Sequence, residues 1–203
     1  MKQALFTCFT VLAIGFFCSV AAQEMVEEGS TGKMFPASVQ FSYDGADYAL
    51  NLTGTTVRKK FVFKVYGVAH YMDVSGKMSE KEALAKALED GVAKQIVMDF
   101  SRDVGADKIQ GAYRETFENN TTKAEYAAIE SLVNQFIGYF NEEIKEDQQY
   151  VLRWLPGGVL LTTINGVEKP AITNAVLARA LWSAWLGEDA IVDRENLVSR
   201  IAN

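Results

Sequence analysis

The sequence predicts an α+β fold, in which an antiparallel sheet of about seven strands is covered by helices on one face. Strong hairpin signals join successive strands, as at Asp44-Gly45 and Asn165-Gly166. The helical segments do not alternate one by one with the strands, which argues against a parallel sheet. No internal repeat or Pro/Gly-rich linker divides the chain, so residues 35–203 are predicted to form one domain.

Residues 1–22 have the pattern of a secretory signal peptide. Lys2 precedes a long apolar run, and Val20-Ala21-Ala22 supplies the small residues that cleavage before Gln23 requires. An uncleaved membrane anchor is the alternative, because residues 4–22 are nearly long enough to span a bilayer. Cleavage would give a secreted, periplasmic protein with no stable membrane insertion.

The next part of the chain predicts a flexible segment followed by paired strands. Residues 23–34 are polar and aperiodic, and we expect a flexible lead-in outside the fold. The runs at 38–43 and 46–52 alternate in hydrophobicity and flank a turn signal, so they predict a hairpin. Residues 54–72, GTTVRKKFVFKVYGVAHYM, follow either as one long strand or as a bent pair of strands.

The middle of the chain predicts one strand among three helices. Ser79 and Glu82 have the spacing of a capping box, and Thr122 and Glu125 repeat it before a second helical pattern. A run dense in β-forming residues separates the first helix from the others. The predicted ranges are a helix at 79–90, a strand at 94–101, and helices at 105–118 and 123–142.

The C-terminal part predicts a meander of strands followed by helices. Pro156-Gly157-Gly158 is a turn signal between two β-forming runs, and Gly187 ends a long apolar helix. The predicted ranges are strands at 150–155, 159–164 and 167–172, and helices at 173–186 and 193–201.

The composition argues against several classes of function. The chain carries 20 Lys and Arg against 26 Asp and Glu, a net charge of −6, so nucleic acid is not a predicted partner. Its one histidine is His70, and its two cysteines, Cys8 and Cys18, lie in the predicted signal. We therefore predict no metal site and no cofactor. The GSTGK run at 29–33 lacks the spacing of a phosphate-binding loop.

Several single residues have both a chemical and a structural interpretation. His70 lies on an alternating strand and is predicted to be a half-buried structural histidine. Asp99 could be a buried acid with a raised pKa, but a solvent-facing position or a pair with Arg102 is the expected outcome. Trp182 and Trp185 could line an apolar cavity, although their helix is expected to pack on the sheet.

The pattern G-x-x-V-R-K-K at 54–60, followed by F-K-V-Y-G-V-A-x-Y at 63–71, resembles the chalcone isomerase superfamily. The similarity is to its non-catalytic fatty-acid-binding members and to bacterial chalcone isomerase-like proteins. Further similarity occurs in FPASVQF (35–41), SRDVGADKI (101–109) and NAVLARALWSAWLG (174–187). The resemblance implies an open-faced β-sandwich, with a ligand cleft between the antiparallel sheet and the helices.

The resemblance also implies roles for individual residues. In the fatty-acid-binding relatives an arginine and a tyrosine hold the ligand's carboxylate, and these match Arg58 and Tyr66. The enzymes of the superfamily have a threonine near the position of Tyr66 and a pocket Ser or Thr where this chain has Ala184. A tyrosine and an asparagine that the enzymes carry after the central strand have no clear match, although Tyr113 is nearby and is the third candidate site residue.

The sequence leaves open whether Arg58 and Tyr66 converge. On a straight strand, eight residues would separate them by about 26 Å, too far to share one carboxylate. A short hairpin would bring them together, but residues 59–63 contain no Gly, Pro or Asn. On a straight strand, we would instead expect Arg58 to be paired with an acid of a neighbouring strand.

The predicted function is a secreted, non-catalytic binding protein for a small amphipathic carboxylate such as a fatty acid. One alternative is an intramolecular lyase of the chalcone isomerase type that uses Arg58 as an electrophile. The other is an interaction protein whose cleft is filled by side chains.

Overall fold

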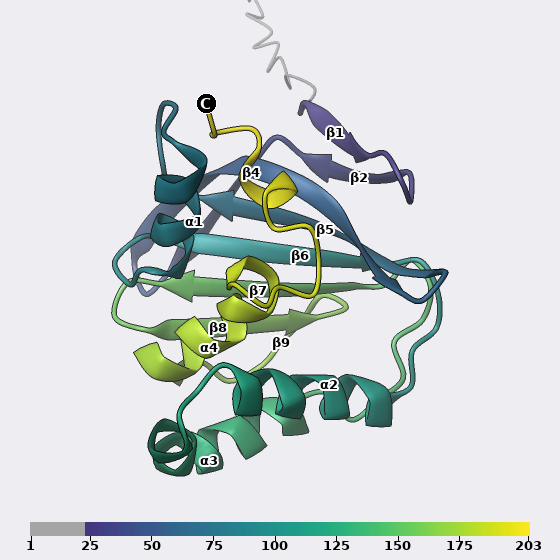
Figure 1. The fold of residues 1–203 in the computed structure, drawn as a ribbon, viewed down its shortest axis with the longest axis vertical. Coiled ribbons are helices and arrows are strands. Elements are labelled where there is room, and N and C mark those ends of the chain that lie inside the picture. The colour runs from purple at the N-terminus through teal and green to yellow at the C-terminus, as the bar shows by residue number, and fades with distance from the viewer. Residues whose placement is uncertain (1–22) are drawn as a thin grey trace, which may run out of the picture.

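The computed structural model describes residues 23–203, and the predicted signal at 1–22 lies outside the described residues. A curved antiparallel sheet with the strand order β10-β8-β7-β6-β5-β4-β3 forms its centre (Figure 1). The strands are β1 (Met25–Glu28), β2 (Lys33–Pro36), β3 (Ser38–Tyr43), β4 (Ala46–Lys60), β5 (Phe63–Met72), β6 (Lys94–Phe100), β7 (Gln149–Leu155), β8 (Val159–Ile164), β9 (Val167–Glu168) and β10 (Ile172–Thr173). The helices are α1 (Glu80–Leu88), α2 (Ala106–Asn119), α3 (Lys123–Gly138), α4 (Ala175–Leu186) and the 3-10 helix η1 (Asn196–Val198).

The helices cover one face of the sheet and enclose the larger core. Helix α4 is buried on almost all sides, contacts α1 and α2, and packs on the sheet; α2 in turn packs on α3. The capping boxes predicted at Ser79 and Thr122 are both formed, with Glu82 and Glu125 as their partners. The prediction of an α+β fold with an antiparallel sheet is confirmed.

Three predicted elements differ in extent. The predicted strand at 167–172 is divided into β9 and β10, which pair with opposite ends of β8, because Pro170 cannot donate to the ladder. Helix α3 ends at Gly138, four residues before its predicted end. The helix predicted at 193–201 is reduced to the single 3-10 turn of η1.

The other face of the sheet is partly covered by a hairpin, β1–β2, which corrects the prediction of a flexible segment at 23–34. Phe35 is buried in a second, smaller core on this face. The Glu28 carboxylate accepts hydrogen bonds from the Thr31 backbone and hydroxyl, which closes the turn. Gly67 permits the approach, since a Cβ there would lie 2.8 Å from Thr31 Oγ1. The segment has too few apolar residues to show these contacts as a periodic pattern.

Lys33 attaches this hairpin to the sheet. Its Nζ lies 2.6 Å from Asp99 Oδ1 and 2.6 Å from Asp147 Oδ1. Burial opposes the charge of Lys33, but the bonds and charges of the two carboxylates outweigh it and raise the pKa of its ammonium group. Asp99 is therefore paired with Lys33, and the expected pairing with Arg102 is not formed.

Residues 54–72 form a bent pair of strands, β4 and β5. The chain turns at Phe61 and Val62, and Phe61 has φ 56°, in the left-handed region that non-glycine residues rarely adopt. Arg58 lies directly opposite Tyr66 in the register of the pair, beside an irregularity between Arg58 and Lys59. The straight-strand alternative, with its separation of about 26 Å, does not occur.

Candidate ligand-binding site

A cavity of about 690 Å³ lies between the end of the β4–β5 hairpin, helix α2 and the segment that follows α4. Its volume falls within the roughly 300–1,000 Å³ typical of small-molecule sites. Apolar side chains make up much of its wall: Phe61, Phe63, Val65, Phe100, Val104, Ile109, Ala112, Ala184 and Ile191. The hypothesis of a cleft filled by side chains is therefore disfavoured.

Arg58 lines this cavity and is held by backbone oxygens. Its Nη1 donates to the carbonyl of Lys59 at 2.9 Å and to that of Ile191 at 2.8 Å. Among residues 23–203, no carboxylate lies within ion-pair distance of this guanidinium. The N–H groups on Nη2 and Nε make no hydrogen bond within the described part of the chain, so one edge of the guanidinium is available to a ligand.

Tyr66 presents a hydroxyl beside Arg58 from the neighbouring strand. The residue is buried and lines the same cavity, and Trp185 Nε1 donates to its hydroxyl at 3.1 Å. Burial raises the pKa of Tyr66 to about 12, against smaller opposing effects of the Trp185 bond and the Arg58 charge. The hydroxyl is thus protonated at neutral pH, and its own proton has no acceptor within residues 23–203.

The third candidate, Tyr113, lies in the core and not in the cavity wall. Its ring packs against Phe140 at 4.6 Å and Phe136 at 5.1 Å between ring centroids. Burial, together with the nearby hydroxyls of Tyr66 and Tyr150, raises its pKa well above the usual value. The structure therefore places Arg58 and Tyr66 together at the cavity and leaves Tyr113 behind it.

Four basic residues line the cavity. Lys60, Arg102 and Lys108 line it in addition to Arg58. The Arg102 guanidinium lies 4.8 Å from the centroid of the Phe63 ring. The acids that share the lining are Asp103, Glu115 and Asp189, of which Asp103 is bound to Lys145 at 3.0 Å.

Lys60, Arg102, Lys108, Phe61 and Phe63 are site residues that the sequence pattern did not indicate. Their approach depends on the position of the hairpin turn, for which no turn signal is present. The family resemblance around Arg58 gave only an indirect indication that this stretch would form the site.

His70 is structural, as predicted, and is fully rather than half buried. Its Nδ1 lies 2.7 Å from Thr53 Oγ1, and the Thr53 hydroxyl donates to the Leu197 carbonyl. Burial, and secondarily the charge of Lys94, lowers the pKa of His70 to about 3. The ring is therefore neutral at physiological pH and lies outside the cavity lining.

The tryptophans of α4 pack in the core. Trp182 makes an edge contact with Trp154, with 5.7 Å between ring centroids, and neither Trp182 nor Trp185 lines the cavity. Their neighbour Ala184 does line it. The expectation that this helix packs on the sheet is confirmed, while Trp185 also supports the site through its bond to Tyr66.

These features define a class: an α+β protein whose helices and curved antiparallel sheet enclose a cavity with an arginine and a tyrosine in its wall. The chain belongs to the chalcone isomerase-like family, whose model matches residues 31–196. A solved structure of a fatty-acid binding protein from Arabidopsis thaliana is similar, with 20% sequence identity and a TM-score of 0.70. The alignment covers 88% of this chain and 97% of that one. At this identity the similarity establishes the fold alone. No curated protein matches the sequence.

Two features are absent from the described residues: a metal-ligand cluster and a membrane-spanning helix. Within residues 23–203, no group of three or more His, Cys, Asp or Glu side chains is arranged to hold a metal ion. None of the helices in this range combines the length and hydrophobicity needed to cross a bilayer.

Proposed function

We propose that this chain is a secreted, periplasmic binding protein that holds a small amphipathic carboxylate, such as a fatty acid, without transforming it. The observation that carries the proposal is the pairing of Arg58 and Tyr66 across two strands in the wall of a cavity that also presents apolar side chains. Secretion rests on the signal pattern at 1–22.

The headgroup chemistry supports a carboxylate. Nη2 and Nε of Arg58 lie on the same edge of a planar guanidinium, the geometry that binds both oxygens of a carboxylate at once. The Tyr66 hydroxyl, with its raised pKa, stays a donor and can add a third bond. Because the bonds from Arg58 to the Lys59 and Ile191 carbonyls fix the guanidinium, little side-chain freedom is lost on binding.

The apolar wall would supply most of the affinity. Burying about ten methylenes at roughly 0.8 kcal/mol each contributes about 8 kcal/mol, against an association cost of at least about 4 kcal/mol. A charged hydrogen bond adds roughly 1.5–3 kcal/mol. The chain of the ligand therefore determines retention, and the two polar residues determine its orientation.

The catalytic alternative has less support from the site. Tyr66 occupies the position at which the sequence comparison expects the enzymes' threonine, and Ala184, which lines the cavity, replaces a pocket hydroxyl. The similar Arabidopsis thaliana structure is that of a fatty-acid binding protein. Both points support carriage without catalysis.

Native mass spectrometry of protein purified without added ligand tests the proposal. We expect wild type to retain fatty acid, Arg58→Ala to lose it, and Arg114→Ala to retain it. Arg114 is a suitable control because it is an exposed arginine of α2 that does not line the cavity. Absence of any bound species, together with no uptake of added fatty acid, would refute carriage. Steady turnover of a chalcone by wild type would establish the catalytic alternative instead.

A further inference from the structure

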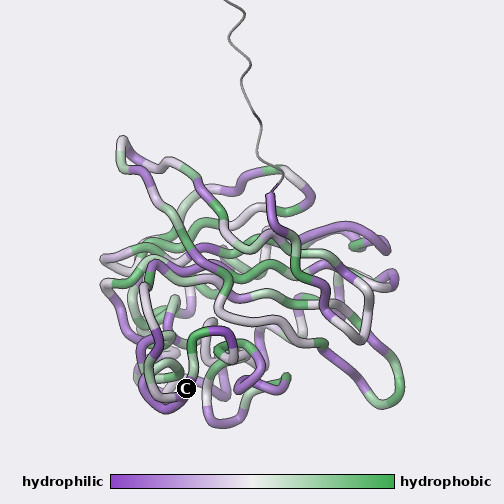
Figure 2. The backbone as a smooth tube through the Cα atoms, turned by 90° about the horizontal axis from the view of Figure 1, so that it is seen from above, coloured by the Kyte–Doolittle hydropathy of each residue, from purple (hydrophilic) through white to green (hydrophobic). Residues whose placement is uncertain are grey.

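The tip of the β4–β5 hairpin is the most exposed apolar segment within residues 23–203. Phe61, Val62 and Phe63 are consecutive and are 89%, 85% and 57% exposed. The hairpin extends beyond the other strands of the sheet (Figure 1), and Figure 2 shows a hydrophobic loop projecting from the body at the lower right. Single exposed apolar residues are common, but three in a row at the end of a projection are unusual.

The fold does not require this composition. Phe61 has φ 56°, a conformation for which glycine or asparagine is the usual choice, and a bulky side chain there carries a strain cost. Polar turn residues would close the same hairpin with less strain and less exposed apolar area. The two phenylalanines and the valine therefore point to a function at this tip.

Basic side chains surround the apolar tip. Lys59, Lys60 and Lys64 flank it on both strands, Arg102 lies against the Phe63 ring, and all four residues are exposed. No acid interrupts residues 58–64, although the chain as a whole carries a net charge of −6. The local excess of positive charge complements an anionic surface.

We propose that this tip docks on an anionic lipid surface. The three apolar side chains would enter the boundary between headgroups and acyl chains, while the four cations meet the headgroups. A lipid surface is favoured over a protein partner because a stable protein interface takes about 800 Å² from each partner, far more than three residues at the end of a hairpin supply. The apolar tip and the basic residues around it can bind a bilayer without a partner of complementary shape.

Docking would also place the cavity against the membrane. Phe61 and Phe63 line the cavity as well as forming the tip, so this part of the cavity wall would lie at the lipid surface. A fatty acid could then pass between bilayer and cavity without crossing water. This consequence rests on the proposed function, whereas docking itself does not.

Vesicle flotation with protein beginning at Gln23 tests docking without any fatty acid, since residues 23–203 contain every described element. Vesicles of phosphatidylcholine are compared with vesicles that also contain phosphatidylglycerol. Each cation near an anionic surface contributes about a fivefold factor, so with at least two of the four engaged we expect at least about 25-fold tighter binding to the anionic vesicles. The difference should shrink in high salt. Failure of wild type to bind anionic vesicles would overturn the proposal.

Matched variants separate the tip from the rest of the surface. Phe61→Ser combined with Phe63→Ser should weaken binding at least about tenfold. Met25→Ser combined with Met34→Ser, which alters methionines that are 45% and 47% exposed on β1 and β2, should leave it within about twofold. Equal binding by wild type and the phenylalanine variant would contradict docking through the tip.

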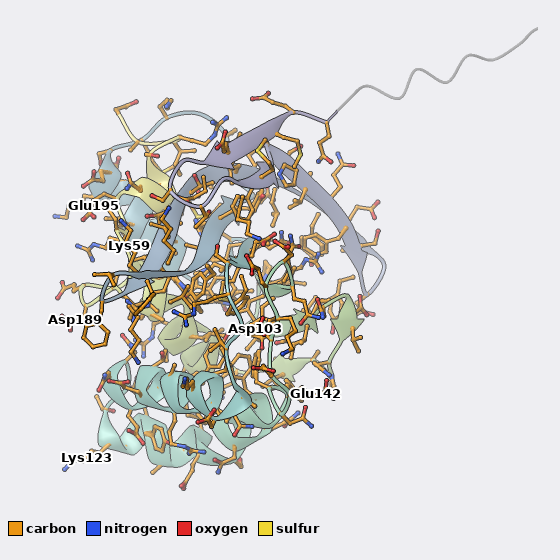
Figure 3. All side chains as sticks on the ribbon, turned by 90° about the vertical axis from the view of Figure 1, so that its right-hand side faces the viewer. Lys59, Asp103, Lys123, Glu142, Asp189 and Glu195 are labelled. Atoms are coloured by element: carbon orange, nitrogen blue, oxygen red, sulfur yellow. The ribbon has the colours of Figure 1, made fainter. Side chains whose placement is uncertain are left out.

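Charge reversal gives a second comparison. Lys59→Glu with Lys60→Glu should weaken binding at least about 25-fold, while Lys81→Glu with Lys123→Glu should not. Figure 3 shows Lys59 on the hairpin and Lys123 at the far end of the helical layer.

Insertion of the tip is tested by fluorescence. The added tryptophan of Phe61→Trp should have its fluorescence quenched by brominated lipid, and absence of quenching would argue against insertion. Arg58→Ala should lose retained fatty acid yet still dock, which distinguishes failure of carriage from failure of docking.

Discussion

Replacing Arg58 by alanine should weaken binding of a long-chain fatty acid while barely affecting the fatty alcohol of the same length. In the proposed complex the Nη2 and Nε edge of the guanidinium binds the carboxylate, and hydrogen bonds to charged groups contribute roughly 1.5–3 kcal/mol. The expected loss for the acid is therefore about 10- to 150-fold. The alcohol has no charged group for the guanidinium to bind, and its contacts with the apolar wall remain in the variant.

Tyr66→Phe provides the second arm of the same test. It removes the hydroxyl proposed to bind the carboxylate, and it also leaves Trp185 Nε1 without its acceptor. We expect a smaller loss of affinity than for Arg58→Ala, and a fall of about 1–3 kcal/mol in the free energy of unfolding. If both residues contact one carboxylate, the double variant should lose less than the sum of the single losses.

Displacement of a fluorescent fatty acid measures these affinities, with the acid and alcohol as competitors. Arg114→Ala controls for the removal of a surface charge, and thermal unfolding checks that each variant is folded. Equal weakening of acid and alcohol by Arg58→Ala would mean that the arginine only shapes the cavity. Additive losses in the double variant would show that the two residues do not act on the same group.

Two further predictions concern stability. Because burial and the charge of Lys94 hold the pKa of His70 at about 3, below its usual 6.5, the unfolded chain takes up the proton first as pH falls. As the pH falls from about 6 to about 4, this contribution should lower the free energy of unfolding by about 1.4 kcal/mol per pH unit. In urea unfolding, His70→Gln should lack this pH-dependent loss. Identical pH profiles for wild type and His70→Gln would refute the lowered pKa of His70. Gly54→Ala should cost about 1–3 kcal/mol, because its Cβ would lie 1.9 Å from the Asn196 carbonyl oxygen. Gly111→Ala, in open space on α2, should be neutral or stabilising by thermal unfolding, and equal effects of the two substitutions would contradict this account.

The regular elements of this chain could be predicted because their signals are local. The capping pairs at Ser79 and Thr122 satisfy backbone groups within one helical turn, so they act wherever the helix is placed. The hairpin at Asp44 similarly needs residues that tolerate a positive φ, and Asp44 and Gly45 both adopt one.

The segments that were mispredicted depend on distant partners. The β1–β2 hairpin is held by Phe35 in a core on the second face of the sheet and by the ion pair of Lys33 with Asp99. These partners are far away in sequence, and the polar composition of 23–34 gives no periodic signal. The turn at Phe61 likewise contains none of the residues that usually favour a turn.

The sequence by itself determined the class of fold, the family to which the chain belongs, and the arginine and tyrosine most worth testing. Only the tertiary structure decided that Arg58 and Tyr66 lie opposite each other, that Ile191 and Trp185 fix them, and that Tyr113 lies behind the cavity. The physical reason is distance along the chain. Ile191 lies 133 residues from Arg58, and such contacts form only when strand pairing and helix packing close the fold.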